Sequence, residues 1–150
     1  MVMPNKVKSG FVGLDKVIDC LRLGDNVVWQ VDSIDDYAQM AEAFVEQAIS
    51  EQRKIIYFRF GDHRPLINRS EIKIYQIDPS KRFESFTTEI YKTVEKEGEK
   101  VLYVFDCLTD LLQYWYSDLM IGNFFKVICP FLYELDTVAY FALLRNVHTF

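Results

Sequence analysis

The stretch Val101-Leu102-Tyr103-Val104-Phe105-Asp106 decides the fold class of this chain. Its apolar residues follow one another without polar alternation, which is typical of a strand covered on both faces. Two further runs, at residues 54–60 and 138–144, have the same character, and shorter runs occur at residues 26–31 and 72–77. Strands buried on both faces belong mostly to parallel sheets, so we expect a mainly parallel sheet of about five strands.

Helical periodicity fills the segments between these runs. Apolar residues recur at helical spacing over residues 34–49 and again over residues 83–94, where Gly98 is placed to end the helix. A longer helical region over residues 108–134 should break near Gly122 or bend at Pro130. A short leading helix at residues 14–21 should end at Gly24. This alternation predicts one three-layer α/β domain over residues 1–150, with helices on both faces of the sheet.

Composition excludes some classes of function. The 150 residues carry 17 Lys and Arg against 22 Asp and Glu, a net charge of −5, and they contain no basic stripe to bind nucleic acid. Charged residues and Pro130 interrupt the apolar residues 111–133, so we expect no membrane span. Three cysteines without C-x-x-C spacing and a start without an apolar leader predict a cytoplasmic protein.

Two motifs resemble the RecA-like ATPases of the KaiC type. The first is Ser9-Gly10-Phe11-Val12-Gly13-Leu14-Asp15, which is followed by Gly24 and an apolar strand. The second is the apolar run that ends at Asp106, which resembles the Walker B strand of those proteins. The resemblance implies a RecA-like P-loop fold, with Asp106 at the position that organises Mg²⁺.

The chain as a whole also resembles the N-terminal domain of phosphoenolpyruvate synthase and pyruvate phosphate dikinase-like proteins. The runs Leu119-Met120-Ile121-Gly122-Asn123-Phe124-Phe125 and Phe141-Ala142-Leu143-Leu144-Arg145-Asn146 carry this similarity. The chemistry of that family uses a phosphohistidine in a T-x-G-G-H-like turn, and neither His63 nor His148 lies in such a turn. We therefore expect the N-terminal part of a longer protein that is not catalytic by itself.

The phosphate loop of the RecA-like family is missing. That loop needs G-x-x-x-x-G-K-[ST] after the first strand, but the turn here holds Asp32, Ser33, Asp35 and Asp36, without glycine or lysine. A phosphate beside one carboxylate at about 4 Å costs about 4 kcal/mol at an effective dielectric constant near 20. A helix N-terminus stabilises an exposed negative charge by only about 0.3–1 kcal/mol. We predict a degenerate Walker A turn in which Ser33 and Asp36 cap the following helix.

Polar residues at the carboxyl ends of the strands are the remaining candidates for ligand binding. The sharper hypothesis is a metal or anion site that uses His63 with Asp62 or Asp106, or Arg64 with Arg145. The other interpretation is that these are ordinary polar loop residues, because no spacing among them is diagnostic of metal ligation. We predict no metal and no cofactor. Asp106 is expected to be structural and to cap the next helix together with Thr109.

Three hypotheses about function remain. The first is a non-catalytic regulatory or assembly domain that forms a homo-oligomer through the aromatic residues 111–133, or that contacts the remaining domains of a longer enzyme. Core packing is the other interpretation of those aromatic residues. The second hypothesis is a part of an active ATP-dependent dikinase, with ATP and Mg²⁺, that contacts nucleotide or pyruvate through Arg64 or Arg145. The third is a small-ligand or metal site at His63.

Overall fold

The computed structural model describes residues 5–115 and 117–148 and contains a parallel five-stranded sheet. The strand order is β3-β7-β6-β4-β5. This confirms the α/β class and the predicted strands to within one residue at each end. Their bounds are β3 Asn26–Val31, β4 Ile55–Arg59, β5 Lys73–Gln76, β6 Leu102–Phe105 and β7 Val138–Leu144.

Position in the sheet explains the sequence patterns of the strands. The three runs with continuous apolar character become the inner strands β7, β6 and β4, of which β6 is buried along its whole length. The edge strands β3 and β5 keep exposed side chains, in agreement with their shorter apolar runs. In register, Tyr57 pairs with Val104 and Leu102 pairs with Val138.

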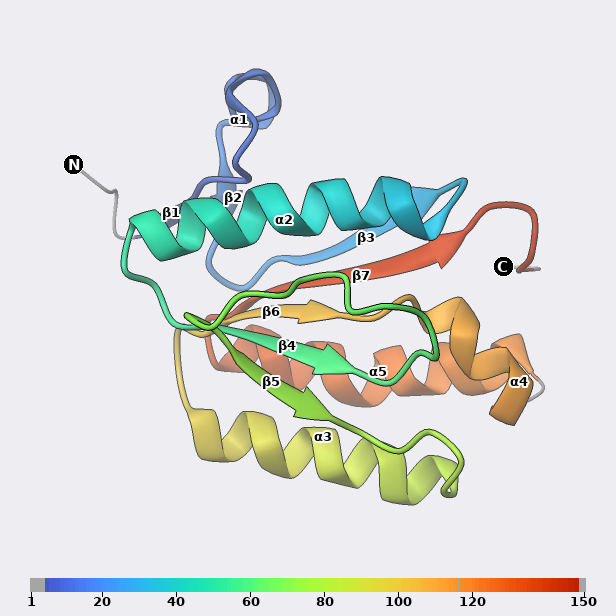
Figure 1. The fold of residues 1–150 in the computed structure, drawn as a ribbon. Helices are drawn as coiled ribbons and strands as arrows, with labels where there is room; N and C mark the ends of the chain where they lie inside the picture. Colours follow the sequence, from blue (N-terminus) through green and yellow to red (C-terminus); the bar gives the residue numbers. More distant parts are fainter. Residues whose placement is uncertain (1–4, 116, 149–150) are drawn as a thin grey trace.

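Helices cover both faces of the sheet, as the sequence predicts (Figure 1). Helix α2 (Ile34–Ser50) lies over one face and buries Tyr37, Phe44 and other residues there. Helices α3 (Phe83–Glu97) and α5 (Asp118–Glu134) lie over the opposite face. Gly98 follows α3 at φ 90°, so the predicted glycine end of this helix is confirmed.

The break in the long helical region lies elsewhere than expected. The 3₁₀ turn η1 (Leu108–Leu111) and the single turn α4 (Leu112–Trp115) come before α5, which begins at Asp118. Its N-cap is Ser117, whose Oγ accepts the N–H of Leu119 at 3.0 Å. Gly122 lies inside α5, so the prediction of a break there is wrong. Pro130 also lies inside α5. The Ser117 N-cap sets the boundary, because its side-chain oxygen satisfies a free N–H group at the start of the helix.

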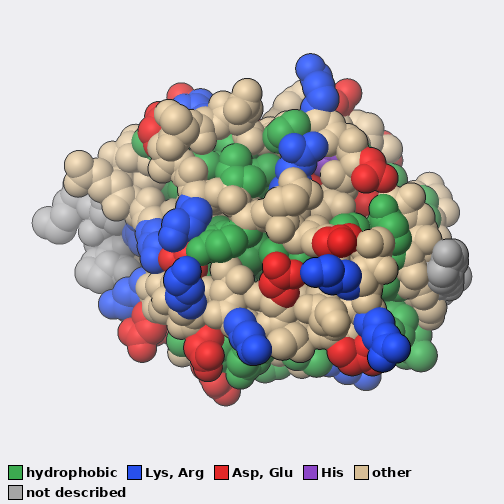
Figure 2. Space-filling model, turned by 60° about the horizontal axis from the view of Figure 1, so that its bottom comes forward, with side chains coloured by type: hydrophobic (Ala, Val, Ile, Leu, Met, Phe, Trp, Pro, Cys, Tyr) green, Lys and Arg blue, Asp and Glu red, His purple; other side chains and the backbone are tan. Residues whose placement is uncertain are grey.

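The described aromatic residues in the 111–133 region mostly pack in or against the core: Trp115 and Phe124 are buried, Tyr114, Phe125 and Phe131 are half-buried against the same cluster, and Tyr133 is 67% exposed. Phe124 is fully buried, and Trp115 packs against Phe86 with ring centroids 5.2 Å apart. Tyr116 lies outside the described residues. On this side of the molecule, exposed apolar side chains are interspersed with charged ones (Figure 2). Among the described helices, none is long and apolar enough to cross a membrane.

A small N-terminal unit was only partly predicted. Strands β1 (Lys6–Val7) and β2 (Leu21–Arg22) form an antiparallel pair around helix α1 (Val12–Ile18). The helix begins and ends earlier than predicted, because Asp19 takes a left-handed conformation at φ 59° and ends it before Gly24. Two-residue strands are too short to leave a periodic pattern.

The order of the strands places one topological switch point. The chain leaves β4 toward the edge strand β5, whereas it leaves β6 in the opposite direction toward β7. Such a switch opens the carboxyl ends of two neighbouring strands, and ligands of open α/β sheets bind there. In this chain the switch lies between β4 and β6, where Phe60, Gly61 and His63 meet Asp106.

Candidate functional site at the carboxyl ends of the strands

Asp106 ties the end of β6 to the end of β4. Its side chain is fully buried, and Oδ2 accepts the N–H groups of Phe60 at 2.8 Å and Gly61 at 2.9 Å. The hydroxyl of Tyr57 donates to Oδ1. The predicted capping of the next helix by Asp106 and Thr109 is therefore wrong, because the carboxylate turns to the neighbouring strand instead.

Burial and hydrogen bonding shift the pKa of Asp106 in opposite directions. Burial raises the pKa of this carboxyl above its usual range, while the hydrogen bonds from Tyr57, Gly61 and Phe60 act in the opposite direction. Burial and the neighbouring Asp106 also raise the pKa of the Tyr57 phenol, which keeps it a hydrogen-bond donor. Both Tyr57 and Asp106 are shielded from solvent.

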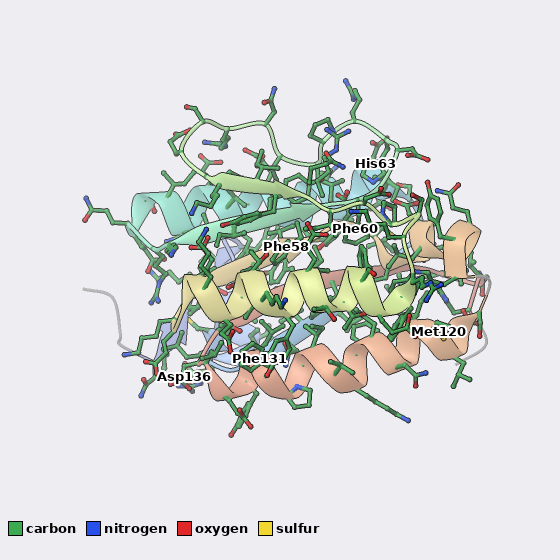
Figure 3. The ribbon with its side chains drawn as sticks, turned by 90° about the horizontal axis from the view of Figure 1, so that it is seen from below. Phe58, Phe60, His63, Met120, Phe131 and Asp136 are labelled. Atoms are coloured by element: carbon green, nitrogen blue, oxygen red, sulfur yellow. The ribbon has the colours of Figure 1, made fainter. Side chains whose placement is uncertain are left out.

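His63 lies beside this pair, just beyond Phe60 at the end of β4 (Figure 3). Its Nε2 is 3.1 Å from Oδ2 of Asp110 and 3.9 Å from Oδ1 of Asp106, and its Nδ1–H donates to the carbonyl of Arg64 at 2.7 Å. The carboxylate of Asp110 raises the pKa of His63 to about 9, against the opposing effect of burial. The imidazole is therefore a cation at neutral pH.

Gly61 makes room for this ion pair. A Cβ atom at this position would lie 2.6 Å from both Oδ2 of Asp110 and Nε2 of His63. Real Cβ atoms do not come so close to other heavy atoms, so only glycine fits beside the pair as it stands.

The other predicted site residues are not all brought together. Asp62 is exposed and accepts from Gln113 at 3.3 Å, so His63 joins Asp106 and Asp110 rather than Asp62. Arg64 and Arg145 follow β4 and β7, which β6 separates in the sheet. Within residues 5–115 and 117–148, no three His, Cys, Asp or Glu side chains are grouped so as to hold a metal ion.

The turn after β3 has the predicted helix cap. Ser33 is the N-cap of α2, and its Oγ accepts the N–H of Asp36 at 3.2 Å. Asp35 and Asp36 occupy the first helical turn. Asp32 makes an exposed ion pair with Arg145, whose Nε lies 3.8 Å from Oδ1.

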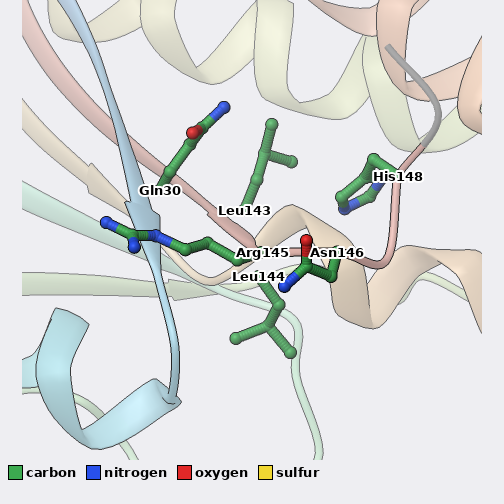
Figure 4. Close-up of a pocket in the computed structure, with 6 residues that line it drawn as sticks. All are labelled: Gln30, Leu143, Leu144, Arg145, Asn146 and His148. Carbon is green, nitrogen blue, oxygen red and sulfur yellow. The ribbon is translucent and has the colours of Figure 1, made fainter.

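A pocket of about 260 Å³ opens beside this turn, at the carboxyl ends of β3 and β7. Figure 4 shows Gln30 and Arg145 on one side, His148 on the other and Asn146 between them. The lining residues are Gln30, Leu143, Leu144, Arg145, Asn146 and His148.

His148 is fixed from both ring nitrogens. Nδ1 lies 2.6 Å from Oδ1 of Asp118 at the start of α5, and Nε2 lies 2.6 Å from Oγ1 of Thr109. That Thr109 oxygen also accepts the N–H of Leu144 at 3.0 Å. This chain of contacts joins η1, α5 and the segment after β7, and it makes one wall of the pocket rigid.

Sequence reasoning missed several residues of these two groups. Tyr57 lies in the middle of an apolar strand, and no local signal marks its hydroxyl as the partner of Asp106. Asp110 follows Asp106 by four residues. The 3₁₀ turn η1 brings its carboxylate to His63, but a single turn has no recognisable hydrophobic periodicity in the sequence. Gln30 comes near Arg145 only because β3 pairs with β7, and Asp118 meets His148 only because α5 packs near the end of β7.

Comparison with known proteins adds no relative: no family model matches the chain, and a search of curated proteins returns no match.

Proposed function

We propose that this chain is a non-catalytic, RecA-like regulatory or assembly domain associated with a phosphoenolpyruvate synthase or pyruvate phosphate dikinase-like protein. One observation carries the proposal. At the position where the RecA-like resemblance implies a phosphate loop, Ser33 caps α2 with its own hydroxyl, and Asp35 and Asp36 occupy the first turn. An incoming phosphate would meet carboxylates where the family's loop presents a lysine.

Asp106 supports the same conclusion. In the family it would help to organise Mg²⁺, but here it is fully buried and both of its oxygens accept hydrogen bonds from β4 and the residues after it. A metal ligand needs an oxygen that faces the ion and its phosphate partners. The residues present therefore do not fit the magnesium–nucleotide site that the resemblance implies.

Helix α1 supports an assembly role. None of its residues is buried, and Val12 and Val17 are 75% and 84% exposed. A seven-residue helix is marginal by itself, and several exposed apolar side chains on one short element commonly mark a protein contact. Because RecA-like domains associate side by side, we propose a second copy of this chain as the partner.

Thermal unfolding with ATP–Mg²⁺, ADP, pyruvate and phosphoenolpyruvate tests the loss of nucleotide binding. A ligand that binds only the folded state adds about 2.7 kcal/mol of stability at 100 times its Kd, which is readily seen. We expect no shift with either nucleotide. A saturable shift with ATP–Mg²⁺ that disappears in Arg64→Ala or Arg145→Ala would instead favour the second hypothesis, a nucleotide-contacting part of an active dikinase.

Sedimentation over a wide concentration range tests assembly. We expect association that Val17→Asp weakens at least tenfold. Leu119→Asp is the matched control, because Leu119 is 68% exposed on α5, in the region that the aromatic sequence pattern favoured. Monomer at every concentration would contradict the assembly role, and a loss of association in Leu119→Asp alone would move the contact from α1 to α5.

A further inference from the structure

We propose that the pocket at the carboxyl ends of β3 and β7 binds a small monocarboxylate, whose carboxylate pairs with Arg145. The pocket is distinct from the group formed by Asp106, Tyr57 and His63, and it contains four polar side chains, namely Gln30, Arg145, Asn146 and His148. This inference does not depend on the regulatory or assembly function, because, among the described residues, the pocket is lined by none of those of α1 or of the Ser33 cap that carry that proposal.

Arg145 is available for an anion. Its side chain is 58% exposed, and its contact with Asp32 is a single long one at 3.8 Å to a carboxylate that is itself 75% exposed. An exposed pair of this kind contributes little stability, so breaking it costs little. A guanidinium can instead form two parallel hydrogen bonds with one carboxylate, which is the stronger arrangement.

The size and lining of the pocket limit the ligand. Its volume of about 260 Å³ is below the range of about 300–1,000 Å³ that drug-sized ligands occupy, which favours a small ligand. Leu143, which pairs with Gln30 in register, supplies the apolar side chain of the pocket, whereas the Leu144 side chain points to the opposite face of the sheet (Figure 4). The amides of Gln30 and Asn146 supply donors and acceptors for a polar substituent.

Charge favours a monocarboxylate over phosphate. Asp32 lies beside Arg145, and Asp35 and Asp36 follow in the first turn of α2. Their repulsion grows with the charge of the ligand, so a phosphate dianion is penalised more strongly than a single carboxylate.

The wall opposite Arg145 is already organised. His148 is held between Asp118 and Thr109 at 2.6 Å each, and its side chain is 5% exposed. A ligand therefore does not have to order this side of the pocket, which lowers the cost of binding.

Titration followed by the side-chain amide NMR signals of Gln30 and Asn146 tests the site directly. The probes are butyrate, its neutral isostere butanamide, and inorganic phosphate. We expect saturable shifts of both amides with butyrate, and at least tenfold weaker binding of butanamide and of phosphate. Equal shifts with butanamide, tighter binding of phosphate, or no saturable shift with butyrate would each overturn the proposal.

Two pairs of variants with equal changes in charge separate the site from a general electrostatic effect. Arg145→Gln should weaken butyrate binding at least tenfold, whereas Arg64→Gln, at an exposed arginine after β4, should leave it unchanged. Asp32→Asn should tighten binding more than Asp35→Asn, because only Asp32 pairs with Arg145 among the described residues. An equal loss in both arginine variants would contradict a site at Arg145. Binding of ATP–Mg²⁺ without binding of butyrate would do so as well.

Discussion

At neutral pH the His63 imidazole is held in its charged form by Asp110, whose carboxylate lies 3.1 Å from Nε2. Its pKa rises from 6.5 to about 9 on folding. The native state therefore binds the extra proton, and this stabilisation is fully present below pH 6.5 and is lost as the pH rises through 9. At 1.36 kcal/mol per pKa unit the full shift corresponds to about 3 kcal/mol, and solvent screening of the partly exposed pair reduces this to about 1–2 kcal/mol.

Urea unfolding from pH 6 to pH 10 measures this contribution. We expect the free energy of unfolding of the wild type to fall across this range relative to that of His63→Gln, with the two curves converging above pH 9. Parallel curves for the two proteins would show that His63 does not change its pKa on folding. Asp110→Asn is the second variant, and it should return the NMR titration of His63 toward its ordinary range.

Gly61→Ala tests the same ion pair by a steric route. The new Cβ atom would lie 2.6 Å from both members of the pair, so we expect His63 and Asp110 to separate and the pKa of His63 to fall. Both contacted atoms are ends of partly exposed side chains that can swing aside, so we expect the loss of stability to be that of the ion pair, about 1 kcal/mol or less. Gly122→Ala is the matched control, because a Cβ there meets nothing within 4 Å inside α5. Chemical denaturation and the His63 titration measure both effects, and an unchanged pKa in Gly61→Ala would contradict the close approach.

Single residues were the hardest feature to predict. The sequence indicates that Asp106 ends a buried strand, and burial follows from that position. Its partners do not follow, because Tyr57 is 49 residues away and meets Asp106 only after β4 and β6 pair. Ser33 is the opposite case, since a helix cap depends on its own next three residues and was predicted correctly.

At the scale of the element, the start of α2 depends on the Ser33 cap. Removing the hydroxyl in Ser33→Ala leaves the N–H of Asp36 without its partner, and we expect a loss of about 1 kcal/mol in the free energy of unfolding. Ser33→Asn retains an oxygen acceptor and should restore most of this stability. Urea denaturation compares the two variants. Equal losses in both would show that the hydroxyl does not cap the helix.

Elements were predictable where burial imposes a long pattern. Strands β4, β6 and β7 and helix α2 each carry a continuous or periodic apolar signal. The region from Leu108 to Glu134 does not, because it is apolar on several sides and its boundaries depend on single caps such as Ser117. Patterns of hydrophobicity fix the interior of an element better than its ends.

At the scale of the whole molecule, one sheet separates two hydrophobic clusters. The cluster under α2 contains Tyr57 and Tyr140, and the cluster under α3 and α5 contains Phe58 and Phe141. Neighbouring residues of one strand thus belong to opposite clusters. The strand order that joins them was not predictable, because each apolar run is a local signal and pairing is set by the crossovers between runs.

This shared sheet predicts that both clusters unfold together. The chain has two tryptophans, of which Trp29 packs against the α2 cluster and Trp115 belongs to the α3–α5 cluster. Trp29→Phe and Trp115→Phe each leave one fluorescent reporter, on opposite faces of the sheet. Disrupting either face exposes β4, β6 and β7 from one side, so we expect the fluorescence of each variant to change at the same urea midpoint as its own circular dichroism. A fluorescence midpoint that precedes the loss of helix in one variant would mean that its face opens separately, and the prediction of one domain over residues 1–150 would fail.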